Sequence, residues 1–179
     1  MKSTLKHIVC AGVIICGSAG QRAYSQNDIS FATPQEAANQ AKTHLLAVMQ
    51  LQKQMALGVE AAAIEKSRPG RPLKRFQITF DELLSTDSFA KVTGNELTTV
   101  VPLVADNKVV TTVEVAKDEK GWRIAALADK AMADELNAIQ KATADPSEVV
   151  IYDLPHTHHK VYAVTRKDGG ETAGPTLRY

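Results

Sequence analysis

The sequence predicts an α+β fold in which a long N-terminal helix packs on one face of an antiparallel β-sheet, with a second helix inserted. Three observations lead to this prediction. An amphipathic stretch, with apolar residues three and four apart, runs from about residue 34 to 63. Segments that alternate apolar and polar residues follow between residues 76 and 166. A second amphipathic stretch, beginning at Asp129, interrupts them.

The first residues carry the features of a cleaved secretory signal peptide. Lys2 and Lys6 give a positive start, and a short apolar run follows them. Ala23-Tyr24-Ser25 then places small residues where a signal peptidase reads the chain. We therefore expect residues 1–25 to be a signal peptide and residues 26–179 to be a single α+β domain, periplasmic or secreted. A buried first helix is the alternative, which the glycines after the apolar run disfavour.

Cysteine content and charge restrict the chemistry of the mature segment. Both cysteines, Cys10 and Cys16, lie in the expected leader, so the mature segment has no disulfide, no cysteine nucleophile and no thiolate metal site. The leader holds three of the 21 basic residues and none of the 20 acidic ones. The mature segment is therefore slightly acidic, which argues against nucleic acid as a partner. No apolar run reaches the roughly 18 residues that a transmembrane span needs.

The long helix is expected to begin at about Pro34. Thr33 can cap the helix, Pro34 suits its first turn, and Glu36 completes a capping box. The apolar stripe continues to the alanines at 61–63, so we expect one helix over this whole stretch. The Pro69-Gly70 pair should prevent its continuation.

The expected strands follow in order. Residues 76–80 alternate as one half-buried strand, and a short helical turn comes after it. Residues 97–127 predict an antiparallel meander with a turn at Asp106-Asn107. Pro102 within it indicates an edge strand or a bulge. Beyond the helix that Asp129 caps, two further strands are expected, at residues 148–154 and 157–166, and the tail at 172–179 is a candidate edge strand.

This order of elements resembles the cystatin-like and NTF2-like folds, in which a long N-terminal helix packs across a curved sheet. The segment 117–127 (KDEKGWRIAAL), a polar turn that enters a strand through Gly-Trp, is similar to what such small exported domains carry. The resemblance covers about residues 33–142 and lies in the arrangement of elements. It implies a fold and carries no catalytic function with it.

The densest group of candidate metal ligands lies near the last strand. In an extended segment His156 and His158 point the same way, and Asp153 precedes them across Pro155. These three residues could bind Zn or Cu. The alternative is a polar strand start with exposed histidines. His44 lies far away in the sequence and completes no second cluster.

A basic segment between the long helix and the first strand is a second candidate site. Arg68, Arg71, Lys74 and Arg75 follow Lys66 without an intervening acidic residue. Such a loop could bind a carboxylate, a phosphate or an anionic envelope glycan. The alternative is a solvated connection whose charges keep the surface soluble.

Catalytic signatures are missing from the sequence. It contains no H-E-x-x-H, no G-x-S-x-G and no glycine-rich phosphate loop. We therefore predict an exported, non-enzymatic binding or accessory domain for a protein, a peptide or an envelope component, without a cofactor. Two alternatives stay open: a small-ligand pocket protein or enzyme of the NTF2-like type, and a periplasmic metal-binding protein that uses the histidine cluster. The oligomeric state stays open as well.

Overall fold

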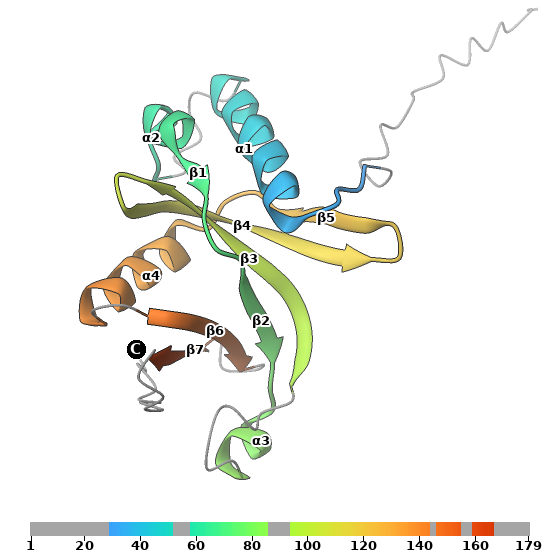
Figure 1. Ribbon diagram of the computed structural model, residues 1–179, viewed down its shortest axis with the longest axis vertical. Coiled ribbons are helices and arrows are strands. Elements are labelled where there is room, and N and C mark those ends of the chain that lie inside the picture. Colours follow the sequence, from blue (N-terminus) through green and yellow to red (C-terminus); the bar gives the residue numbers. More distant parts are fainter. Residues whose placement is uncertain (1–28, 52–57, 86–93, 144–145, 155–158, 167–179) are drawn as a thin grey trace, which may run out of the picture.

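One seven-stranded sheet organises the chain in the computed structural model, which describes residues 29–51, 58–85, 94–143, 146–154 and 159–166 (Figure 1). The strands are β1 (Arg68–Pro69), β2 (Leu73–Gln77), β3 (Asn95–Ala105), β4 (Lys108–Asp118), β5 (Gly121–Ala126), β6 (Pro146–Leu154) and β7 (His159–Arg166). The helices are α1 (Pro34–Leu51), α2 (Ala61–Lys66), α3 (Phe80–Ser85) and α4 (Lys130–Ala142). The order across the sheet is β5-β4-β3-β2-β6-β7, and β1 pairs with β3. The α+β class is as expected.

The meander expected between residues 97 and 127 is confirmed. Strands β3, β4 and β5 pair antiparallel in sequence order. Asp106 and Asn107 adopt φ values of 50° and 59° in the turn between β3 and β4. Two successive left-handed residues match the right-handed twist of a two-residue hairpin, and Asp and Asn tolerate that conformation.

One pairing departs from the antiparallel sheet that the sequence predicts. Strands β2 and β6 run parallel, with Arg75 opposite Ile151. The chain reaches β6 through α4, which carries it across the sheet to the free side of β2. The prediction of a wholly antiparallel sheet is therefore wrong at this position, since alternation along a strand does not indicate which strands become neighbours.

The long helix is interrupted. α1 is described as far as Leu51, and a separate helix, α2, begins at Ala61 after the non-helical residues 58–60. Gly58 has φ 65°, and Glu60 is extended with φ −83° and ψ 135°. Neither conformation continues an α-helix. The prediction of one helix over residues 34–63 is therefore wrong, because the glycine adopts a left-handed conformation that its missing Cβ permits.

The start of α1 follows the sequence pattern. Glu36 N donates to Thr33 Oγ1 at 3.2 Å, and Ala32 N donates to Glu36 Oε2 at 3.1 Å. The first bond satisfies a backbone N–H that the first helical turn leaves without a partner, and the second pairs the N–H of the residue before the cap. Asp129 caps α4 in the same way, since its Oδ1 accepts from Met132 N at 2.8 Å.

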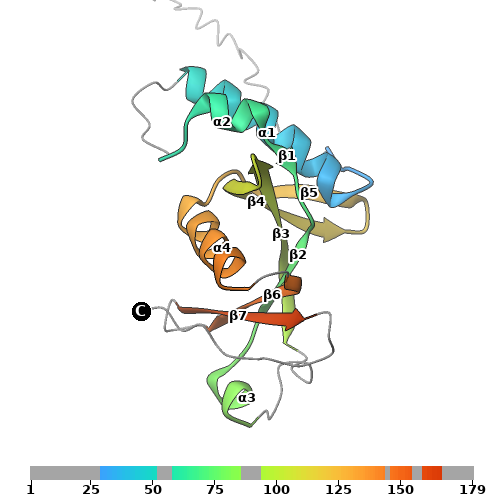
Figure 2. The same ribbon diagram turned by 60° about the vertical axis from the view of Figure 1, so that its left-hand side comes forward.

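Helices cover both faces of the sheet. Small residues of α1 pack against one face in a buried cluster of Ala37, Ala38, Ala41, Val101, Leu103, Val113 and Val115. α4 packs against the other face in a cluster of Val100, Val109, Met132, Ala133, Leu136, Ile139, Ile151 and Tyr162. Neighbouring residues of β3 thus contact different helices, as the alternation of a strand requires. Figures 1 and 2 show α1 and α4 separated by β3 and β4.

Pro102 lies in a central strand rather than at an edge. β3 pairs with β4 on one side and with β1 and β2 on the other. Pro102 falls between the β1 and β2 pairings, where its carbonyl accepts from Gly70 N at 2.7 Å. The N–H and C=O of one strand residue point in the same direction. The N–H that Pro102 lacks would therefore point into the gap between β1 and β2, so its absence removes no hydrogen bond between strands. The edge alternative is therefore wrong, whereas the bulge alternative agrees with the shift of the β3–β4 register between Leu103 and Val104, next to Pro102.

Candidate functional site

The sheet ends differently at its two outer strands. β5 forms one end, and Phe31 pairs with its residue Trp122. Phe31 N donates to Trp122 O at 2.8 Å, and Trp122 N donates to Phe31 O at 2.9 Å. The chain leading into α1 thus takes up the outward backbone groups of β5 at this residue, which shields part of an edge that could otherwise pair with another chain.

The other end of the sheet is β7. The hydrogen bonds of its neighbour β6 indicate in which direction the backbone N–H and C=O groups of β7 point. Ile78 N donates to Asp153 O at 3.0 Å, so Asp153 directs its backbone groups toward β2. Successive residues of a strand direct these groups to opposite sides, and therefore Tyr152 bonds toward β7. Its partner there is Val161. Val161 consequently directs its N–H and C=O toward β6.

The same alternation leaves every second residue of β7 facing outward. Lys160, Tyr162 and Val164 direct their N–H and C=O groups away from β6. Within the described ranges, β7 pairs with β6 and with no other strand. Its pairing shows no register shift from His159 to Thr165, and the segment has neither proline nor glycine. This regular, β-prone edge lacks most of the features that prevent strand addition.

The side chains of these outward residues lie under α4. Tyr162 is buried and its hydroxyl donates to Glu135 Oε2 of α4. Lys160 Nζ lies 3.7 Å from Oδ2 of Asp129, the residue that caps α4. Val164 packs against the α4 cluster. The open backbone edge is thus bordered on one face by polar groups of the helix.

Burial raises the pKa of Tyr162 well above its usual range. The hydrogen bond to Glu135 and the negative charges of Glu135, Asp129 and Asp153 act in the same direction. The phenol is therefore neutral at every pH at which the protein would act, and it donates a hydrogen bond rather than serving as a base.

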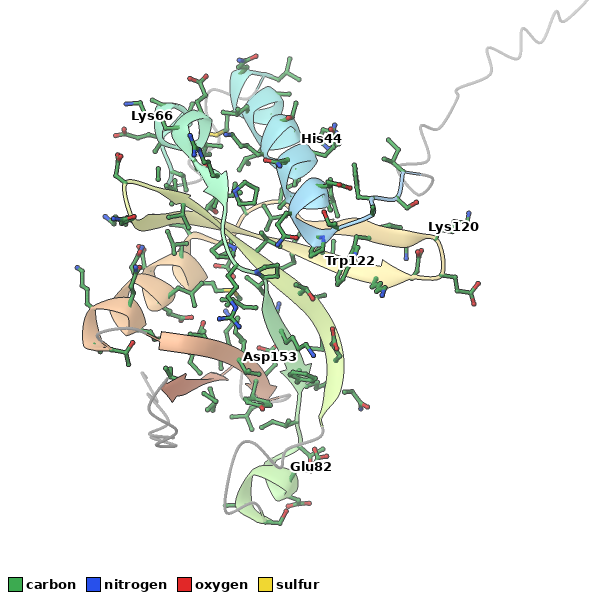
Figure 3. All side chains as sticks on the ribbon, in the orientation of Figure 1. His44, Lys66, Glu82, Lys120, Trp122 and Asp153 are labelled. Carbon is green, nitrogen blue, oxygen red and sulfur yellow. The ribbon has the colours of Figure 1, made fainter. Side chains whose placement is uncertain are left out.

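A second group of charges continues this polar surface across the sheet. Arg75 on β2 donates from Nε to Asp153 Oδ2 at 2.7 Å and pairs through Nη1 with Glu114 Oε1 on β4. Thr98 Oγ1 lies 3.4 Å from Glu114 Oε2. The three charged side chains are 16–19% exposed. Figure 3 shows Asp153 where β6 lies beside β2.

Arg75 is charged and forms ion pairs with both Glu114 and Asp153. Burial acts to lower the pKa of Arg75, but the hydrogen bonds that Arg75 donates to Asp153 and Glu114 and the charges of these two carboxylates outweigh it and raise the pKa. We call the whole set the polar cluster. Its members are Arg75, Glu114, Asp129, Glu135, Asp153, Lys160 and Tyr162. It contains four carboxylates and two cations.

The structure separates the residues predicted to bind an anion. Arg68 and Lys74 are exposed on β1 and β2, and Arg71 is exposed between these strands. Arg75 is the neighbour of Lys74 on a strand, so the two side chains point to opposite faces. Since Arg75 is occupied by two carboxylates, it does not belong to one anion-binding loop with the others. Anion binding by Arg68, Arg71 and Lys74 stays a prediction.

The predicted metal ligands are not brought together in the described structure. Asp153 pairs with Arg75, while His156 and His158 lie outside the described residues. Across the ranges that the structure describes, no three His, Cys, Asp or Glu residues are arranged to hold a metal ion. A metal site at Asp153, His156 and His158 stays a prediction.

A surface depression lies beside α4 among the described residues. It is lined by Lys108, Asp134, Asn137, Ala138, Lys141 and Ala142. Asp134 is paired with Lys130, and the Asn137 amide is bonded to the backbone of Val109 on both its N and O atoms. Its carboxylate and amide therefore already have partners within the fold, and Lys108 and Lys141 are the other charged groups of its lining.

Comparison with family models, with curated proteins and with solved structures finds no significant match to this chain. The resemblance to cystatin-like and NTF2-like folds therefore stays a prediction. Among the described helices, none is long and apolar enough to cross a membrane. Any functional assignment has to come from the geometry of the chain itself.

Proposed function

We propose that this chain is an exported, non-enzymatic binding protein that takes up an extended peptide segment as an additional strand on β7. The observation that carries the proposal is the outward row of backbone groups on Lys160, Tyr162 and Val164, which no described strand pairs. Adding a strand to such an edge is a recurrent way of binding peptides. The slightly acidic composition of the mature segment favours a peptide over a nucleic acid.

The edge offers both directions of hydrogen bonding. Each outward residue presents one N–H and one C=O, and each bond formed with a peptide contributes about 0.5–1.5 kcal/mol net. Val161 and Ala163 flank the row on the face opposite α4. Val161 belongs to a third apolar cluster, and Ala163 packs against it. A bound strand would therefore extend apolar surface on one face and meet polar groups on the other.

Export is the second part of the proposal. It rests on the charge, apolar run and small residues of the first 25 residues. Expression of the full chain in a secreting bacterium, followed by intact-mass measurement, tests it. A mature protein beginning at Gln26 in the periplasm or medium is expected. Uncleaved protein retained in the cytoplasm would contradict this part alone.

Amide hydrogen exchange followed by NMR tests the edge directly. In the free protein, the amides of Lys160, Tyr162 and Val164 should exchange rapidly, whereas those of Val161 and Ala163 should be protected. A displayed library of random peptides is then selected against the wild-type protein. A selected peptide should protect the three outward amides on binding.

Two variants decide whether binding uses this edge. Val164→Pro removes one outward N–H and should abolish binding of the selected peptides, whereas Val164→Thr keeps the N–H and the branched shape and should bind normally. Equal affinity for both variants would overturn the proposal. Outward amides that are already protected in the free monomer would also overturn it, because the chain would then cover its own edge. Protection that grows with protein concentration would assign the edge to a second copy instead.

A further inference from the structure

The side chains beside the β7 edge can select the sequence of a bound peptide, which backbone hydrogen bonds cannot do. Main-chain bonds select an extended conformation but no particular sequence. In a sheet, residues opposite each other on neighbouring strands lie on the same face, with Cβ atoms about 5 Å apart. A strand added to β7 therefore places one of its side chains next to Tyr162, under α4.

The charges near that position are unbalanced. Arg75 is shared by Glu114 and Asp153, and Lys160 lies beside Asp129. Glu135 accepts a hydrogen bond from the neutral hydroxyl of Tyr162 and has no cationic partner among the described residues. A carboxylate in a partly buried position gains most from a cation that also donates a hydrogen bond.

The reach of the side chains fits the same pairing. The Tyr162 hydroxyl spans the distance from β7 to Glu135. Lysine and arginine are the cationic side chains of comparable length, and their aliphatic parts can lie along the tyrosine ring. An acidic side chain at this place would face Glu135 and the further carboxylates of the polar cluster, which costs free energy.

We infer that the strand bound at β7 carries a lysine or arginine beside Tyr162, with its cationic group paired to Glu135. This inference rests on the proposed function and specifies which peptides the edge accepts. The backbone groups of β7 provide binding in general, and Glu135 provides the preference for a basic residue.

Three synthetic peptides test the inference. They have the sequence Val-Thr-Val-X-Val-Thr-Val, with lysine, glutamine or glutamate at X, so that the valines lie on the apolar face and X lies on the face of Tyr162. Fluorescence anisotropy measures their dissociation constants. The lysine peptide should bind about tenfold more tightly than the glutamine peptide, because lysine adds the attraction of an ion pair to a hydrogen bond that glutamine can also donate to Glu135. The glutamate peptide should bind most weakly. Added salt should reduce these differences.

Two matched variants locate the preference. Glu135→Gln keeps an acceptor for Tyr162 and should make the lysine and glutamine peptides bind equally. Asp134→Asn removes the same charge from the neighbouring residue, whose side chain is 59% exposed, and should leave the preference unchanged. A tenfold preference that survives in Glu135→Gln would overturn the inference.

The two proposals fail in different ways. If all three peptides bind the wild type equally and Val164→Pro abolishes their binding, strand addition stands and the basic preference is wrong. If none of the three binds, both the peptide-binding function and the preference that rests on it are wrong.

Discussion

The β5 and β7 ends of the sheet show two ways of terminating the same kind of structure. At β5 the chain entering α1 adds an isolated pair of hydrogen bonds between Phe31 and Trp122. At β7 the outward groups of three residues have no partner in the described part of the chain. The contrast indicates that a segment from elsewhere in the chain, rather than the composition of the strand, decides whether an edge is paired among the described residues; the tail at 172–179, a candidate edge strand, lies outside them.

The interior beside each end differs as well. Near β5, α1 packs through alanines onto valines and a leucine, without charged groups in the cluster. Near β7, α4 and the sheet enclose both an apolar cluster and the polar cluster. The β5 end is therefore stabilised by apolar burial, whereas the β7 end depends in addition on satisfied charges.

The largest expected effect contrasts two neighbouring residues of β7. Ala163→Pro removes an N–H that faces β6 and should lower the free energy of unfolding by about 3 kcal/mol. Val164→Pro removes an N–H that faces outward and should cost clearly less. Urea denaturation measures both. Similar losses for the two variants would show that the outward row of backbone groups is assigned incorrectly.

Replacing Arg75 tests whether the β7 end, unlike the β5 end, depends on paired charges for its stability. Arg75→Met leaves Glu114 and Asp153 without their cation and should cost about 3 kcal/mol, since uncompensated buried carboxylates are destabilising. Lys74→Met, next to it on the exposed side, should change stability by less than about 0.5 kcal/mol. An Arg75→Met protein as stable as wild type would show that the polar cluster is solvated.

Displacing the segment around Phe31 should leave the outward backbone groups of Trp122 unpaired, as those of β7 are among the described residues. Gly121 has φ 134°, and a Cβ there would lie 2.7 Å from Phe31 O. Gly121→Ala should therefore cost about 2 kcal/mol and displace the segment that pairs with Trp122. Faster amide exchange at Trp122 is the expected signature. Lys120→Ala, at the neighbouring exposed position, should leave that exchange unchanged.

The smallest expected effect concerns the hydrogen bond of Tyr162. Tyr162→Phe should cost about 1 kcal/mol at neutral pH. Because folding raises the pKa of Tyr162, the folded state holds the phenolic proton more tightly, and wild-type stability should decline as pH rises above about 10. Tyr162→Phe should lack this part of the decline. Urea midpoints that fall in parallel for both proteins would show that Tyr162 does not contribute.

The parts of the fold that follow local rules are predictable from sequence. Asp106 and Asn107 suit a left-handed turn, and the alternating residues on both sides suit paired strands, so the meander is recognised without knowledge of the rest. Asp129 marks the start of α4 for an equally local reason. Gly58 is a residue type that disfavours the interior of a helix, but the apolar stripe on both sides of it led to the prediction of one continuous helix.

The candidate site depends on contacts that no local pattern contains. Arg75 and Asp153 are 78 residues apart and meet only because β6 enters beside β2. From the sequence we predicted Arg75 to bind an anion and Asp153 to bind a metal ion. Neither prediction included a contact between these two residues. A usable signal was present in Glu114, a charge enclosed by valines within a strand, which implies a partner on the face opposite those valines.

Composition, turn residues and capping residues were sufficient to establish the α+β class, the meander and the positions of the two helix starts, because each depends on interactions within a few residues of chain. The tertiary structure alone decided the parallel β2–β6 pairing, the pairing of Phe31 with Trp122 at the β5 end and the outer position of β7 among the described strands. Hydrogen bonds between strands are chemically alike at every residue, so local sequence cannot state which edge finds a partner. Packing of α4 against the sheet selects the neighbours and so leaves β7 outermost.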